Sequence, residues 1–203
     1  MKIDFTRIKQ QKVKDLVRLH QLQEVSDFQK VKYICYSEAE GGYRSHHKSF
    51  IIKASIEKVW EAYQTIHPRE AWGGNMISIG LVYCKQSNTI IYPEDSYDGA
   101  KEGQILFVHL NLLGGLVQLG VAHAIHKIDS DSKVFTICYV EKGSSVGSQY
   151  ISMKETAEGH TLVSHDTKYK SDSTFRDRYL YPTFHEKALT IYHENIKRKV
   201  ESV

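Results

Sequence analysis

The sequence predicts an α+β fold in which one antiparallel sheet packs against a long C-terminal helix, and three features indicate it. Residues 182–200 contain no Gly and carry apolar side chains at helical spacing. Residues 77–170 alternate apolar runs with turn residues, which is typical of successive antiparallel strands. A strand followed directly by a helix, over residues 50–66, precedes them. One broad sheet would therefore cover the apolar side of the terminal helix.

The terminal helix is predicted to begin at Pro182, because the first helical turn does not need the N–H that proline lacks. Basic residues in its last turns suit the helix dipole. One stripe of this helix is apolar but includes a histidine and two tyrosines. The stripe consists of Tyr181, His185, Ala188, Leu189, Tyr192 and Ile196. We expect this stripe to face the sheet.

The length of 203 residues fits a single core, preceded by a short extension. Residues 1–45 are interpreted as an N-terminal helical extension, with a helix over 5–25, and residues 46–203 as the main domain. Short links rich in Gly, Pro, Asp and Ser separate the expected strands and favour antiparallel neighbours. Strands are expected at 31–36, 50–53, 77–84, 88–92, 103–112, 117–128, 133–141, 147–156 and 160–170.

Composition and charge argue against several classes of protein. Hydrophobic content of 41% and charged content of 25% are ordinary for a soluble globular domain. A net charge of +3 is too small to indicate a nucleic-acid-binding protein. Polar residues interrupt the most apolar window, residues 110–125, so we expect no integral membrane association. The N-terminus lacks the apolar core of a secretory signal, which favours a cytoplasmic location.

The sequence carries no recognisable metal or cofactor pattern. The cysteines Cys35, Cys84 and Cys138 stand far apart without a C-x-x-C pair, which predicts reduced thiols instead of a disulfide framework. The 11 histidines include no H-E-x-x-H pattern, and His126 and His165 are expected on one face but several strands apart. Nucleophile-elbow, phosphate-loop and dinucleotide motifs are absent as well. We therefore expect no metal and no cofactor, and assign no catalytic residue.

The passage FIIKASIEKVWEAY, at residues 50–63, reads as a strand, an N-capping Ser55 and a helix. It resembles the opening of the START-like, or Bet v 1-like, helix-grip superfamily (SRPBCC), which includes polyketide cyclases. The resemblance extends over residues 46–200 and rests on Ile51, Ile52, Ala54, Ser55, Val59 and Trp60. It implies a curved antiparallel sheet wrapped around the C-terminal helix, with a ligand cavity between them. It does not imply one reaction, because the superfamily includes carriers, hormone binders, cyclases and chaperone regulators.

The alternation of side chains along strands predicts which residues face that cavity. We place the centres of three turns at Asp131, at Ser144–Ser145 and at Glu158–Gly159. One face is then aromatic with few polar groups, as a small-molecule pocket requires. It collects Ala122, Ala124, His126, Phe135, Ile137, Tyr139, Tyr150, Ser152, Val163, His165, Thr167 and Tyr169. The opposite face carries most of the charge and is expected to point outward.

The predicted ligand contacts combine this face with the terminal helix, because Tyr and His offer an apolar body and a hydrogen-bonding tip. They are Tyr139, Tyr150, His165, Tyr169, Tyr181, His185 and Tyr192. Each also has a simpler interpretation as a packing residue of a filled core.

The predicted function is binding of a lipophilic small molecule, such as a lipid, an isoprenoid or a polyketide-like compound. One alternative is a cyclase or dehydratase that uses a pocket histidine as general acid or base. Another is a protein-interaction domain. Three roles stay open for residues 1–45: covering a sheet edge, closing the cavity, or forming a homodimer.

Overall fold

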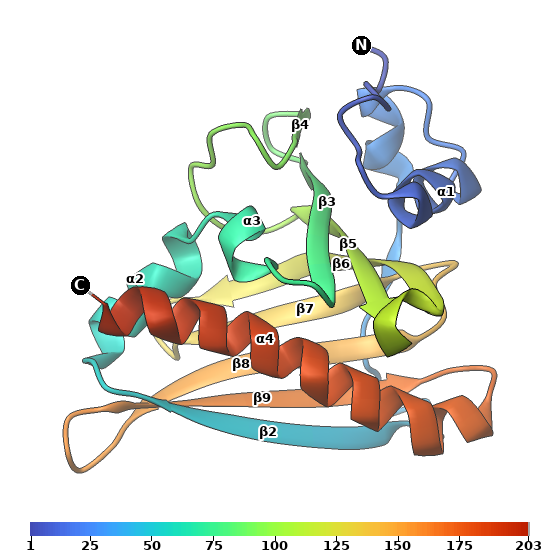
Figure 1. The fold of residues 1–203 in the computed structure, drawn as a ribbon. Coiled ribbons are helices and arrows are strands. Elements are labelled where there is room, and N and C mark those ends of the chain that lie inside the picture. The colour runs from blue at the N-terminus through green and yellow to red at the C-terminus, as the bar shows by residue number, and fades with distance from the viewer. Residues whose placement is uncertain (203) are drawn as a thin grey trace.

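The centre of the molecule is one nine-stranded antiparallel sheet that wraps around the C-terminal helix (Figure 1). The computed structural model describes residues 1–202. The strands are β1 (Tyr33–Ile34), β2 (Arg44–Ile52), β3 (Ile77–Cys84), β4 (Thr89–Ile91), β5 (Ile105–Leu112), β6 (Val117–Asp129), β7 (Val134–Val140), β8 (Val146–Glu155) and β9 (Thr161–Lys170). They are ordered β2-β9-β8-β7-β6-β5-β3-β4, and β1 pairs with the end of β7. The predicted α+β fold is confirmed, and the sheet has nine strands.

The helices lie on both faces of this sheet. They are α1 (Gln11–Leu19), η1 (Val25–Lys30), α2 (Ile56–Thr65), α3 (Pro68–Ala71), η2 (Leu113–Gly115), the π-helical turn η3 (Arg176–Leu180) and α4 (Tyr181–Glu201). Helix α4 starts one residue before Pro182, which occupies its first turn as predicted. It runs across the inner, concave face beside α2 and α3, whereas α1 lies on the other side of β5 and β6 (Figure 1). Within residues 1–202, no helix combines the length and apolarity needed to span a membrane.

The inner core joins α2 and α4 to the sheet. Val59, Trp60 and Tyr63 form the buried face of α2, and the ring of Trp60 lies 4.7 Å from that of Phe135 on β7. Ser55 occupies the N-cap of α2, as predicted, but its side chain makes no capping hydrogen bond. The strand-to-helix passage therefore anchors the inner core chiefly through its apolar side chains.

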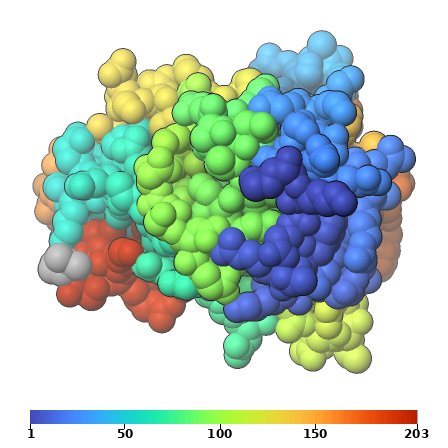
Figure 2. Space-filling view, turned by 90° about the horizontal axis from the view of Figure 1, so that it is seen from above, coloured from blue at the N-terminus to red at the C-terminus, as the bar shows by residue number. Residues whose placement is uncertain are grey.

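The outer core lies on the opposite face of β3, β5 and β6, beneath the N-terminal segment. In the space-filling view this segment, in blue, lies directly against green atoms, the colour range that includes β3 (Figure 2). Helix α1 approaches β6 so closely that a Cβ on Gly120 would stand 2.4 Å from the carbonyl oxygen of Lys12. The helix is shorter than the predicted 5–25 at both ends. It begins at Gln11, and after its last residue, Leu19, Gln21 adopts a left-handed φ of 58° and turns the chain back. The boundary between an extension at 1–45 and the main domain stays a prediction.

Strands β7 and β9 present the predicted residues inward, but β8 is reversed. Cys138 pairs with Ser148, so the β7–β8 hairpin centres on Gly143 instead of Ser144–Ser145, which exchanges the two faces of β8. Val146 pairs with Lys170, so the next hairpin centres on Glu158. This second shift cancels the first, and β9 therefore keeps its predicted face.

The predicted inner face of β6 is also wrong. His123 pairs with Tyr139, and directly paired residues share a face of a sheet, so His123 points inward. Ala122 and Ala124 instead pack in the outer core beneath α1. His126 sits at a register irregularity between Ile125 and Lys127 and is exposed, so it does not share a face with His165.

Two of the three cysteines are joined. Cys35, just after β1, forms a disulfide with Cys138 on β7. The prediction of reduced thiols is therefore wrong for this pair, and Cys84 is the one free cysteine within residues 1–202. The partners are 103 residues apart, so their spacing gives no sign of the pairing.

Candidate functional site

A small cavity lies between the inner face of the sheet and helices α2–α4. Its volume of about 50 Å³ holds a few water molecules, whereas pockets for drug-sized ligands measure roughly 300–1,000 Å³. Its walls are mostly apolar or aromatic, with three histidine or amide side chains among them. They are formed by Tyr63, Ile66, Pro68, Ala71, Trp72, Tyr97, Ala100, Leu106, His123, Ile125, Phe135, Ile137, Gln149, Ile151, His165 and Tyr192.

A chain of buried hydrogen bonds crosses the interior beside this cavity. The Tyr63 hydroxyl lies 2.5 Å from Nδ1 of His193, on α4. Nε2 of His193 lies 2.8 Å from Nδ1 of His165, on β9. Nε2 of His165 lies 2.9 Å from Oε1 of Gln149, on β8. One helix-to-sheet network therefore links α2, α4, β9 and β8.

Neutral histidines give this chain a single direction. The amide oxygen of Gln149 only accepts, so Nε2 of His165 carries a proton and its Nδ1 accepts. Nε2 of His193 then donates to His165, and Nδ1 of His193 accepts from the Tyr63 hydroxyl. Every hydrogen bond in the chain is satisfied with each imidazole carrying one proton.

Burial keeps the inner histidines neutral. Desolvation lowers the pKa of His123 to about 4, and it lowers the pKa of His193 to about 3, with a smaller effect from His185. Burial also lowers the pKa of His165, further reduced by nearby His193. Burial, with His165 nearby, lowers the pKa of His185 in the same way. At neutral pH these side chains are therefore uncharged, and they do not act as acids through an imidazolium.

Several inner polar atoms are buried without a hydrogen-bond partner in the described part of the chain. They are both ring nitrogens of His185, Nδ1 of His123, Nδ1 of His46 and Oγ1 of Thr167. The ring of His185 lies 5.3 Å from that of His46 and 6.0 Å from that of His165. Buried polar groups in proteins are normally paired. We call the region formed by His46, His123, Thr167 and His185 the polar end of the interior. Its buried donor and acceptor atoms are free to form hydrogen bonds with a polar group.

Three tyrosines adjoin the polar end. The rings of Tyr169 and Tyr181 stack at 3.8 Å, and Tyr181 also stacks on His185 at 4.7 Å. The hydroxyls of Tyr139 and Tyr181 share a hydrogen bond, and Tyr169 donates to the carbonyl oxygen of Asp177 at 2.8 Å. Burial raises the pKa of both Tyr139 and Tyr181, which keeps the two phenols protonated.

The structure brings six of the seven predicted contact residues to the inner side. His165 and Tyr192 line the cavity, whereas Tyr139, Tyr169, Tyr181 and His185 contact one another outside its lining. The placement of Tyr150 on the inner face is wrong. It pairs with Asp166 on the outer face of β9, a consequence of the reversed β8.

The sequence interpretation missed His193, His123 and Gln149. Helical spacing contained a signal for His193, because Leu189, His193, Ile196 and Val200 are all buried and follow an i, i+4, i+7, i+11 pattern. Gln149 was missed because the β7–β8 turn was placed too late, which assigned β8 the opposite face. For His123 the sequence did contain a signal, because a turn centred on Asp131 pairs it with Tyr139, as observed.

Comparison with known proteins identifies the fold. No protein-family model and no curated protein matches the sequence. Norcoclaurine synthase from Thalictrum flavum, solved with dopamine and hydroxybenzaldehyde, matches with a TM-score of 0.60 and 14% identity over 84% of this chain and 96% of that chain. Ara h 8.0201 matches with a TM-score of 0.54 and 15% identity over 80% of this chain and 100% of that chain.

A third structure leads to the same conclusion. Major latex-like protein 151 from Panax ginseng matches with a TM-score of 0.55 and 14% identity over 78% of this chain and 98% of that chain. All three are Bet v 1-like helix-grip proteins. At these identities the likeness concerns the fold, and the chain has the helix-grip fold that its sequence resemblance predicts.

Proposed function

We propose that this protein binds a small, largely apolar molecule with a hydrogen-bonding group, between the inner face of the sheet and α4. The observation that carries the proposal is the set of buried atoms without a partner among the described residues: Nδ1 of His123, which lines the aromatic cavity, and atoms of His185 and Thr167 outside its lining. Leaving such a group unpaired costs about 1–3 kcal/mol. A ligand that bonds to these atoms removes that cost, which gives the polar end a role in orientation.

The aromatic walls favour a flat apolar body. The rings of Trp72 and Tyr192 are 4.5 Å apart and border the cavity together with Phe135. A volume of about 50 Å³ favours a small molecule over a long lipid chain, and binding must widen the cavity. The complex of norcoclaurine synthase with dopamine and hydroxybenzaldehyde supports the choice of a small aromatic compound, since that protein has the same fold.

Native mass spectrometry of the purified full-length protein, followed by denaturing extraction, is the first test. A stoichiometric adduct of low mass is expected, with an aromatic or otherwise apolar body. Titration with 4-hydroxybenzaldehyde then provides a defined probe. Both tryptophans of the chain, Trp60 and Trp72, belong to the inner core, so their indole NMR signals should shift as the probe saturates the site.

Substitution of His185 identifies the polar end as the site. His185→Ala should weaken binding of the probe or adduct about 5- to 30-fold, which corresponds to about 1–2 kcal/mol for one neutral hydrogen bond. His47→Ala is the matched control, because His47 is exposed on the outer face of β2 and should not affect binding. Absence of both an adduct and saturable probe binding would contradict the proposal, as would equal binding by both variants.

An enzyme that uses acid–base chemistry is the second candidate, and His123 favours it. His123 lines the cavity, and its Nδ1 is buried without a hydrogen-bond partner within the described residues, whereas both ring nitrogens of His165 are engaged by His193 and Gln149. The test is incubation of any extracted adduct with the protein in D₂O. Incorporation of deuterium at carbon by the wild-type protein, and its loss in His123→Gln, would support catalysis, whereas an unchanged adduct mass would favour binding alone.

A further inference from the structure

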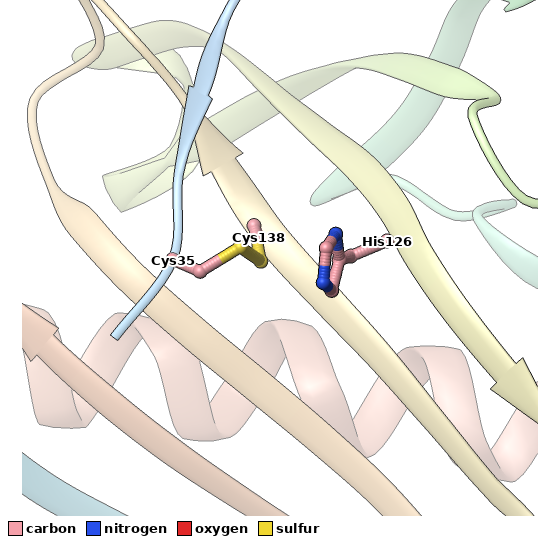
Figure 3. Close-up of side chains that lie close together, drawn as sticks. All are labelled: Cys35, His126 and Cys138. Atoms are coloured by element: carbon pink, nitrogen blue, oxygen red, sulfur yellow. A yellow bond between two sulfur atoms is a disulfide. The ribbon is translucent and has the colours of Figure 1, made fainter. Parts of the chain in front are cut away.

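We propose that Cys35, His126 and Cys138 bind one Zn²⁺ ion when the disulfide between the two cysteines is reduced. The three side chains converge on the outer side of the sheet, away from the cavity (Figure 3). Their ligand atoms, two sulfurs and one imidazole nitrogen, all lie within 4.8 Å of one another. This site does not depend on the function proposed for the inner face.

Three separate strands bring the ligands together. Strand β1 pairs with β7 through Ile34 and Tyr139, which brings the following residue, Cys35, to Cys138. His126 reaches the same point from the irregularity in β6, where the extra residue re-aims its side chain. The site therefore exists only when the N-terminal segment is docked on the sheet.

The donor set suits Zn²⁺. Thiolates and a neutral imidazole are its preferred ligands, at about 2.3 Å and 2.0–2.1 Å, and three protein ligands leave a fourth position open. Cys138 is buried, Cys35 is half-buried and His126 is exposed, so the open position faces solvent. Tetrahedral geometry at these bond lengths separates two sulfurs by about 3.8 Å. Ligand atoms already gathered within 4.8 Å need only small movements to reach it.

Neighbouring hydroxyl groups are placed to support the ligands. Ser148 accepts a hydrogen bond from the backbone N–H of Tyr36 at 2.8 Å, which leaves its own proton free to donate. Its Oγ lies 3.5 Å from Sγ of Cys138. The Tyr33 hydroxyl lies 3.2 Å from Nδ1 of His126 and orients the ring. Such outer contacts tune metal ligands and fix the tautomer of a coordinating histidine.

The disulfide and the metal exclude each other. A dithiol reductant transfers two electrons and two protons to the disulfide, the S–S bond breaks, and the reductant becomes a disulfide itself. Zn²⁺ then binds both sulfurs, and the two thiol protons pass to water. Both states fasten the N-terminal segment to β7. In a compartment that keeps thiols reduced, the zinc state would prevail.

Metal titration of the full-length protein tests this proposal. The protein is reduced anaerobically with a phosphine, the phosphine is removed, and Co²⁺ and then Zn²⁺ are added. One equivalent of Co²⁺ should bind, with thiolate-to-cobalt charge-transfer absorption and the intense visible bands of a tetrahedral ion, and Zn²⁺ should displace it. The oxidised protein should show neither absorption.

Single substitutions assign the ligands. Cys35→Ser should abolish most of the charge-transfer absorption, and His126→Ala should weaken Co²⁺ binding by at least about tenfold. Cys84→Ser is the matched control, because Cys84 is buried elsewhere and should leave the titration unchanged. One test does not depend on the folding of any variant. If the reduced wild-type protein shows no thiolate–cobalt absorption, the proposal is overturned. Undiminished binding by Cys35→Ser or His126→Ala would overturn it equally.

Discussion

The two faces of one sheet differ in the kind of side chain they bury. The outer core, beneath α1, consists of residues such as Ile8, Val13, Phe28 and Phe107, all almost completely buried. The inner core, beneath α4, also buries polar side chains among its apolar residues, including His123, Gln149, His165, Thr167 and His193. Alternate residues of the same strands supply both faces, so strand propensity does not explain the difference.

This contrast separates stability from function. Apolar burial stabilises a fold without further requirement, whereas a buried polar group is costly unless it is paired. The inner face accepts that cost at His123, His185 and Thr167, whose buried atoms lack partners among residues 1–202. The outer face is therefore the one expected to secure the sheet, and the inner face the one expected to bind.

The largest expected effect comes from removing an aromatic ring on the outer face. Phe28 lies 4.9 Å from Tyr83 and 5.6 Å from Phe107, ring to ring. Phe28→Ala should lower the free energy of unfolding in urea by about 3–5 kcal/mol, because it leaves a cavity in a packed core. Phe175→Ala, at a side chain that is 63% exposed, should change it by less than about 0.5 kcal/mol. A loss below 1 kcal/mol at Phe28 would mean that the N-terminal segment contributes little to stability.

The next effect is a pH dependence specific to the inner face. The pKa of His123 is about 4 in the folded protein and about 6.5 in an unfolded chain. Between these pH values the unfolded chain binds the proton and the folded protein does not. The free energy of unfolding should therefore be fully retained above pH 6.5 and decrease as the pH falls to 4, by about 1.4 kcal/mol per pH unit for this histidine.

His123→Leu measures this contribution directly. Urea unfolding at a series of pH values should show a shallower decrease in the variant than in the wild-type protein. His47→Leu should alter the pH dependence of the free energy of unfolding less than His123→Leu does, because His47 is exposed on the outer face. Equal slopes for wild type and His123→Leu would mean that the histidine is accessible to protons in the folded state.

The sequence predicted most strands closely because the local turn signals are strong, although the strand expected at 50–53 is only the end of β2 (Arg44–Ile52). Residues 77–84 were predicted as a strand and form β3, and the predicted strand at 160–170 differs from β9 by one residue. The face of the sheet to which each side chain points was harder to predict, because a shift of one residue in a turn exchanges the two faces of the next strand. Lys142 adopts a left-handed φ of 59° in the β7–β8 hairpin. Lysine gives no sign of such a conformation, whereas Gly143 and the two serines after it favoured a later turn.

On β8 and β9, the predicted face was correct only where errors in turn position cancelled. His165 was placed correctly because two successive turn shifts compensated each other, whereas Tyr150, between those turns, was placed on the wrong face. The pairing of Cys35 with Cys138 depends on β1 joining β7, a contact between distant parts of the chain. Long-range contacts of this kind have no local signal in a single sequence.

The smallest expected effect comes from two buried threonines of β9, and it tests the cost of unpaired polar atoms. Thr161 donates a hydrogen bond to the carbonyl oxygen of Ala54 at 2.8 Å, whereas Oγ1 of Thr167 is buried without a partner within residues 1–202. Thr161→Val should lower the free energy of unfolding by about 1 kcal/mol, because a carbonyl loses its donor. Thr167→Val should leave it unchanged or raise it by up to about 1 kcal/mol, because an unpaired hydroxyl is replaced by a methyl group. Equal destabilisation by the two substitutions would show that Thr167 already has a polar partner in solution, and binding of the probe should then be insensitive to Thr167→Val.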